Sequence, residues 1–270
     1  MTRAYECLNF HGAVGFTDVT NVQWDMAPYM EAVHYNGKEG VPSIAYEVTV
    51  DHTRFVQRLT AGFPGAKNDK TIIRFDKLIT KIRSKDKHTH TMVGAEGTKH
   101  VQRGAYVYLD GGYHKWGCTI CLMKTCITQE QRNWSDQLES VQKDVECFFG
   151  RITSRWRILK LPLQFHTGEA IDQIFITCYI LQNIFHAWDR LDQLEGDGDW
   201  IGGSEMHDQD VCDLDLDLCQ EGMMDNSPAP GSEQEVEGEA EFYKLRAKTI
   251  EHFSYKKQRN LVEWVTSSYS

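Results

Sequence analysis

The chain has 270 residues, of which 41% are hydrophobic and 25% are charged. This composition is typical of one large or two small globular domains, and it excludes collagen-like, mucin-like and wholly disordered proteins. No run of 18 apolar residues occurs, and residues 1–25 lack the basic and apolar regions of a secretory signal, so we expect neither a membrane span nor export.

The net charge of −10 is unevenly distributed along the chain. Residues 191–241 hold 17 Asp and Glu and no Lys or Arg, which leaves 22 acidic and 29 basic side chains in the remainder. A mildly basic body with a tethered acidic segment suits a protein that binds phosphate polymers and carries its own electrostatic competitor. A solubilising linker beside an ordinary domain is the alternative. The eight cysteines are too few for a disulfide scaffold, and we interpret them as buried apolar residues.

Three strands are predicted at the start of the chain. Apolar residues alternate in residues 12–24 and 43–50, and residues 55–61 follow the same pattern, which favours an antiparallel meander. A Gly-Pro turn at residues 62–69 ends the meander. Asp69 can then cap a helix that runs to about residue 83.

A polar, His-rich loop is expected over residues 84–103, followed by a buried central strand over residues 105–109. This strand stops at Asp110-Gly111-Gly112, which places the Asp110 carboxylate at the edge of the sheet. The apolar spacing then predicts a long helix over residues 135–159, with Ser135 as its N-cap and Glu146 off its apolar stripe.

The next predicted helix, residues 169–188, is apolar nearly all round and should be largely buried. The sequence thus divides into an α/β domain at residues 1–190, a disordered acidic linker at residues 191–240, and a short amphipathic C-terminal helix within residues 241–270.

Three acids fall on separate predicted elements: Asp18 on the first strand, Asp110 after the central strand and Glu146 in the long helix. This is the order in which an RNase H-like sheet brings three carboxylates together. Such a cluster is unfavourable unless a cation neutralises it, because like charges raise one another's pKa. Carboxylate oxygens select Mg²⁺ or Mn²⁺, and a pair of such ions can cleave a phosphodiester.

Four motifs carry a resemblance to a known family. They read DVTNVQWD at residues 18–25, GFPGAKND at 62–69, YLDGGYHKW at 108–116 and SVQKDVECFFGRITSRWRIL at 140–159. In this order they resemble the PIF/Harbinger-type DDE transposases, the plant transposon protein group, from about residue 10 to residue 190. The resemblance implies an RNase H-like catalytic fold and nuclease or recombinase activity on nuclear DNA. It also implies a metal-binding triad of Asp18, Asp110 and Glu146.

The chain also departs from the family pattern. Related chains usually carry a helix-turn-helix region before the first catalytic strand, whereas 17 residues precede Asp18 here, so a copy truncated at the N-terminus is expected. A separate DNA-binding subunit could then supply recognition of the target. Asn21 replaces a common His, Gln142 replaces an Arg, and residues 181–183 read Leu-Gln-Asn rather than Leu-His-Asn.

Several further residues have two interpretations. Asp69 can cap its helix or reach a metal. A basic group on and after the acid-bearing helix can neutralise DNA phosphates or form a solvated face: Lys143, Arg151, Arg155, Arg157 and Lys160. A zinc site or core cysteines are the alternatives for His114, Cys118, Cys121 and Cys126. Base stacking or core packing are the alternatives for Trp116, Trp134 and Trp156.

The leading hypothesis is therefore a nuclear, Mg²⁺- or Mn²⁺-dependent DNA endonuclease derived from a transposase, with strand transfer as a further activity. The competing hypothesis is a catalytically silent chain of the same fold that binds DNA or a protein partner.

Overall fold

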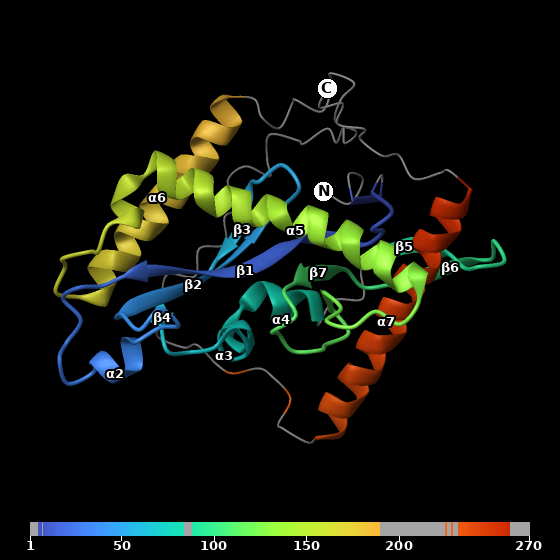
Figure 1. Ribbon diagram of the computed structural model, residues 1–270, viewed down its shortest axis with the longest axis horizontal. Coiled ribbons are helices and arrows are strands. Elements are labelled where there is room, and N and C mark those ends of the chain that lie inside the picture. Colours follow the sequence, from blue (N-terminus) through green and yellow to red (C-terminus); the bar gives the residue numbers. More distant parts are fainter. Residues whose placement is uncertain are drawn as a thin grey trace.

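A computed structural model describes residues 5–6, 8–83, 88–189, 225, 228 and 232–259. Its centre is a six-stranded mixed sheet with helices on both faces (Figure 1). The strands of this sheet are β1 (Ala13–Gln23), β2 (Ser43–Val50), β3 (Val56–Leu59), β4 (Phe63–Pro64), β7 (Tyr106–Leu109) and β8 (Thr119–Cys121). The predicted mixed α/β fold class is confirmed.

The sheet has the strand order β3-β2-β1-β7-β8, and β4 pairs with β2 beside this path. β1, β2 and β3 form the predicted antiparallel meander. β7 lies parallel to β1, and β8 lies parallel to β7, so the predicted central strand is confirmed in the middle of the sheet. β1 is longer than β7 and continues beyond the point where β7 ends.

The prediction of one continuous helix after the meander is wrong. The chain instead forms three short helices: α3 (Asp69–Ile72), η1 (Ile73–Phe75) and α4 (Lys77–Arg83). The break falls at Asp76, whose backbone is extended and whose Oδ1 accepts a hydrogen bond of 2.6 Å from the Leu78 amide. A buried aspartate that caps a new helix therefore ends the previous one.

The predicted loop over residues 84–103 is also wrong. Its described part forms an antiparallel hairpin of β5 (Thr89–Val93) and β6 (Lys99–Arg103). The buried residues on β5 are His90 and Met92, which alternate with exposed threonines. The alternation of β5 is not recognisable in the sequence, because one of its two buried side chains is a histidine rather than an apolar residue.

The long helix α5 spans Gln129–Arg155 and is followed by η2 (Arg157–Lys160). It begins six residues earlier than predicted, because Thr128 rather than Ser135 is the N-cap and forms a capping box with Gln131. The helix α6 spans Gly168–Trp188, close to its predicted bounds. Its burial is only partial, because Ile184 and Trp188 are 53% and 82% exposed.

The C-terminal helix α7 spans Glu233–Gln258 and begins eight residues before the predicted start at about residue 241. It packs against α5, β5 and β8 and crosses the β8 side of the sheet (Figure 1). Most of the predicted disordered linker, residues 191–240, lies outside the described residues, but its last part, residues 233–240, is helical rather than disordered. No described helix is long and apolar enough to cross a membrane.

The two faces of the sheet have separate cores. Phe16 and Tyr108 stack on the face that packs against α5, with ring centroids 4.9 Å apart. Val107 and Leu109 point to the opposite face, where they pack against η1, α4 and Phe242 of α7. This alternation fixes which face each following residue of β1 and β7 occupies.

Candidate functional site

Asp18 lies in β1, and Asp110 is the first residue after the neighbouring parallel strand β7. Thr17 is the partner of Leu109 in the β1–β7 register, and each aspartate is the next residue along its own chain. Thr17 and Leu109 point away from α5. Because successive side chains of a strand point to opposite faces, Asp18 and Asp110 lie on the face that packs against α5. Since neighbouring strands are about 4.8 Å apart, this register brings together two residues that are 92 positions apart in the sequence.

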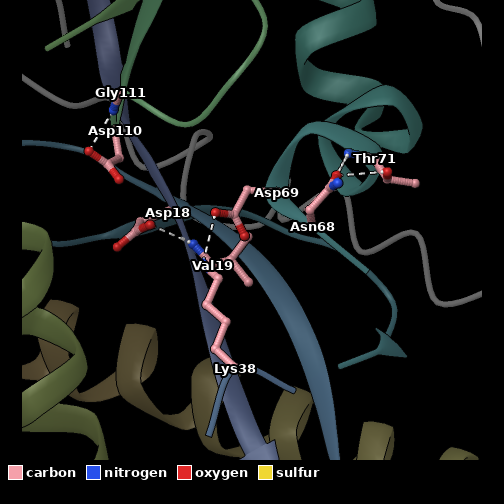
Figure 2. Close-up of polar contacts among 8 residues, drawn as sticks. All are labelled: Asp18, Val19, Lys38, Asn68, Asp69, Thr71, Asp110 and Gly111. Carbon is pink, nitrogen blue, oxygen red and sulfur yellow. Dashed lines mark hydrogen bonds and ion pairs between the residues drawn. The ribbon is translucent and has the colours of Figure 1, made fainter. Parts of the chain in front are cut away.

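Each of these carboxylates accepts a hydrogen bond from the backbone amide of the residue that follows it. Asp18 Oδ1 accepts a hydrogen bond of 2.8 Å from the Val19 amide, and Asp110 Oδ1 accepts one from the Gly111 amide. Figure 2 shows both side chains beside β1. The short bonds to the following residues orient the carboxylates at the point where β7 ends.

Asp69 is the third acid at this place, and its predicted role as a helix cap is wrong. Asn68 is the N-cap of α3, since its Oδ1 accepts hydrogen bonds from the Thr71 amide at 2.9 Å and the Thr71 hydroxyl at 2.8 Å. The Asp69 carboxylate instead pairs with Lys38 Nζ at 3.2 Å. A Cβ on Gly112 would be 3.8 Å from Asp69 Oδ2, so this carboxylate borders the turn that carries Asp110.

Glu146 approaches from the other side of the site, on α5. Its side chain is exposed, and its charge acts on Asp18. Gly150 follows one helical turn later, and nothing lies within 4 Å of the position that a Cβ would occupy there. The helix surface beside Glu146 is therefore open on that side.

Burial raises the pKa of Asp18 from 3.8 to about 6, against the lowering effect of the hydrogen bond from Val19. The carboxylates of Asp110, Asp69 and Glu146 raise the pKa of Asp18 further. The four acids thus share one electrostatic environment, although they come from β1, the β7 turn, α3 and α5. A divalent cation would relieve this repulsion, and hard carboxylate oxygens are the donors that Mg²⁺ and Mn²⁺ prefer.

The donor chemistry fits such a cation, but the side chains do not form a closed cage. Among the residues that the structure describes, no group of three or more His, Cys, Asp or Glu side chains is arranged to hold a metal ion. The acids converge without completing a coordination sphere.

Comparison with known proteins places the chain in a family. A family model described as plant transposon protein matches residues 2–190, which is more than half of the chain. The chain belongs to the plant transposon protein family. This family is related to the Harbinger-type DDE transposases, and the predicted resemblance is confirmed. No curated protein and no solved structure matched the chain.

The basic residues predicted to contact DNA in this plant transposon protein are all exposed. Lys143 pairs with Glu139 at 3.5 Å, and the Arg155 guanidinium donates to Gln182 Oε1 at 3.1 Å and lies over the Phe185 ring. The other three, Arg151, Arg157 and Lys160, lie in the last turns of α5 and in η2. Their contact with DNA stays a prediction.

Among the described cysteines of the family domain, Cys118, Cys121 and Cys178 are buried as predicted, whereas Cys126 is half-buried and Cys147 is exposed. Cys118 and Cys121 are 4% and 5% exposed, and within the described part of the chain no group of three or more His, Cys, Asp and Glu side chains is arranged to hold a metal ion. His114 stacks on Trp116 at 4.9 Å between ring centroids. Trp116 and Trp134 are 4% and 0% exposed, which agrees with core packing rather than base stacking.

The structure adds charged residues beneath the site that the sequence did not reveal. Glu47 pairs with Val19 in the register of β1 and β2, so it lies on the face opposite Asp18. Burial raises the pKa of Glu47 well above its usual value, and the nearby Asp76 carboxylate raises it further. Asp76 itself lies 3.6 Å from the buried Arg58 guanidinium. The alternation of residues 43–50 assigns Glu47 to the polar face of β2, but both faces of this strand are buried, so the sequence pattern alone does not reveal its burial.

Proposed function

We propose that this plant transposon protein is a divalent-cation-dependent DNA endonuclease with Asp18, Asp110 and Glu146 as its metal ligands. The observation that carries the proposal is the convergence of Asp18 with Asp110 across β1 and β7, in the field of Asp69 and Glu146. Membership of a DDE transposase-related family supports DNA as the substrate. Work on nuclear DNA, and therefore a nuclear location, is part of the same proposal.

Bound divalent cations would supply an activated water and would stabilise the leaving oxygen of the phosphodiester. The chain's own residues contribute position and charge. Asp18 and Asp110 are fixed by adjacent strands and by their bonds to Val19 and Gly111, so they form the rigid part of the site. Glu146 is exposed on α5 and would close the ligand set from the opposite side.

Asp69 is a candidate fourth ligand in this proposal. Its carboxylate is held by an exposed Lys38, which is 77% accessible to solvent at its side chain. An ion pair of this kind is weak, so a cation can replace the lysine at little cost. A freed 3′-hydroxyl could serve as the nucleophile in strand transfer, with a separate DNA-binding subunit supplying the target.

The experiment is Mg²⁺-dependent nicking of supercoiled DNA by the purified chain. Nicking by the natural protein should fall by at least about 100-fold in Glu146→Gln, because a metal ligand is lost while the helix surface keeps its shape. Glu130→Gln is the matched control, since Glu130 lies on the same helix and is also exposed. Equal nicking by the natural protein and Glu146→Gln would assign the activity to a contaminant.

The second candidate function is a catalytically silent protein of the same fold that binds DNA or a protein partner. The observation in its favour is that the described carboxylates are not arranged as a set of three metal ligands. It predicts duplex binding that is equal in the natural protein and Glu146→Gln, with no nicking by either. The proposed endonuclease requires the opposite result in the nicking assay.

A further inference from the structure

The helix α7 lies beyond the residues matched by the family model and is divided by charge. Its first nine residues, 233–241, contain five glutamates and no basic residue, and we call them the acidic half of α7. Residues 244–259 contain six Lys and Arg and one Glu. The acidic half can therefore form ion pairs with basic side chains on the surface that it contacts.

The acidic half contacts the loop that follows Asp110. Glu239 Oε1 pairs with Lys115 Nζ at 3.2 Å, and the same ammonium donates a hydrogen bond of 2.6 Å to the Tyr243 hydroxyl. A Cβ on Gly117 would lie 2.6 Å from Glu241 Oε2, so the helix is closely packed on this loop. Just before the helix, Asp225 Oδ2 lies 3.5 Å from Arg74 Nη1.

The two basic residues in these contacts, Arg74 and Lys115, border the candidate active site, and the charge of Lys70 acts on His114, which precedes Lys115. Arg74 and Lys70 belong to the short helices that begin at Asp69, and Lys115 lies five residues after Asp110. We call Lys70, Arg74 and Lys115 the cationic strip. Figure 1 shows the N-terminal end of α7 on the same side of the molecule as α3 and α4.

We infer that the cationic strip is a binding surface for the phosphates of duplex DNA, and that Asp225 and the acidic half of α7 cover it in the free protein. This inference rests on the proposed function, because it assigns the surface that leads DNA to that site. A carboxylate site repels the phosphates beside the one being cleaved, so basic side chains on its border are needed to hold them. The carboxylates of Asp225 and Glu239 stand where these phosphates would bind.

The ion pairs that Asp225 and Glu239 form with the cationic strip are weak enough for DNA phosphates to replace them. Lys115 and Glu239 are 46% and 49% exposed at their side chains, and exposed ion pairs contribute little to stability. A DNA duplex presents many phosphates along its length and releases counterions on binding, which a few carboxylates cannot match. The helix itself stays attached, because Phe242 is fully buried in the core beside Val107 and Leu109.

The test is equilibrium binding of the full chain to a short fluorescent duplex, measured by anisotropy in EDTA so that no cleavage occurs. The uncovered variant is Asp225→Asn with Glu239→Gln and Glu235→Gln; Glu235 is included because it lies in the acidic half and its charge acts on His114, beside Lys115. The control variant, Glu96→Gln with Glu130→Gln and Asp136→Asn, changes the net charge equally at exposed positions outside the contacts of the cationic strip. Thermal unfolding of each variant verifies that the fold is retained.

We expect the uncovered variant to bind about tenfold more tightly than the natural protein at low salt, with a log–log salt slope steeper by about 2, because two more phosphates are contacted. The control should stay within about twofold of the natural protein, because distant charges are screened. Adding Arg74→Gln and Lys115→Gln to the uncovered variant should remove the gain, whereas the same two changes in the natural protein should have little effect.

Equal binding by the uncovered and control variants would overturn the inference, and so would a gain that survives the loss of Arg74 and Lys115. Neither result bears on the proposed endonuclease, which depends on the effect of Glu146→Gln in the nicking assay. Conversely, a nicking result that contradicts the endonuclease proposal does not change how the DNA-binding measurement is interpreted.

Discussion

Replacing Asp18 with asparagine should stabilise the protein at neutral pH, because the folded chain holds this carboxylate in an unfavourable place. Burial and three neighbouring acids raise its pKa from 3.8 to about 6. A shift of about two units, at 1.36 kcal/mol for each unit, corresponds to about 3 kcal/mol of destabilisation when Asp18 is ionised. Asparagine has nearly the same volume and keeps an oxygen that can accept the hydrogen bond from Val19.

The sign of the pH dependence follows from the direction of the pKa shift. Between pH 3.8 and about 6 the folded state binds more protons at Asp18 than the unfolded state does, so acidification favours folding at this residue. The difference in the free energy of unfolding between Asp18→Asn and the natural protein should be about 3 kcal/mol at pH 8 and about 1 kcal/mol at pH 4.5. Urea unfolding followed by tryptophan fluorescence measures this difference at each pH.

Asp25→Asn is the matched control, because Asp25 is exposed just beyond the end of β1. It should change stability by less than about 0.5 kcal/mol at either pH. A difference for Asp18→Asn that does not change with pH, or a loss of stability at pH 8, would refute the reasoning. Mg²⁺ should also stabilise the natural protein more than the variant, since only the former keeps the ligand.

Three other predictions concern stability and use the same urea assay. Burial lowers the pKa of His90 and His252 to about 4, so each should destabilise the folded state by about 2 kcal/mol at pH 5 relative to pH 8; a change in stability between these pH values that is the same in the natural protein, His90→Asn and His252→Asn would contradict this. Tyr46→Phe should cost about 2 kcal/mol, because the Tyr46 hydroxyl donates a 2.6 Å hydrogen bond to Asp172; an unchanged midpoint would mean that this bond adds nothing. Phe242→Ala should cost about 3 to 5 kcal/mol through the cavity it leaves, and a cost below about 1 kcal/mol would show that α7 is not part of the cooperative fold.

The sequence predicted the parts of this fold in which local pattern and tertiary structure agree. The alternation of β1 and β2 and the abrupt end of β7 placed Asp18 and Asp110 correctly on the sheet, because side-chain direction in a strand follows from its period of two. The meander and the central strand needed no further information.

The incorrect predictions concern residues whose type fits two different structural roles. Asn68 and Asp69 can both cap a helix, and nothing local decides between them; the cap falls on Asn68, which leaves Asp69 for the site. His90 fills a core position in β5 although its type suggests a loop. The pairing of Lys38 with Asp69 joins residues 31 positions apart and depends on the tertiary fold alone.

Asp51 is a structural carboxylate in the same protein, and its hydrogen-bond donors differ from those of Asp18. Asp51 is 3% exposed, and its Oδ1 accepts hydrogen bonds from the Thr53 amide at 2.9 Å, the Thr53 hydroxyl at 2.6 Å and the Phe55 amide at 3.0 Å. These donors balance its charge within one turn. Asp18 has a single backbone donor, and its neighbours are other carboxylates. A bound cation would balance the charge that the fold leaves on Asp18 at neutral pH, so this contrast agrees with the cation-binding role proposed for Asp18.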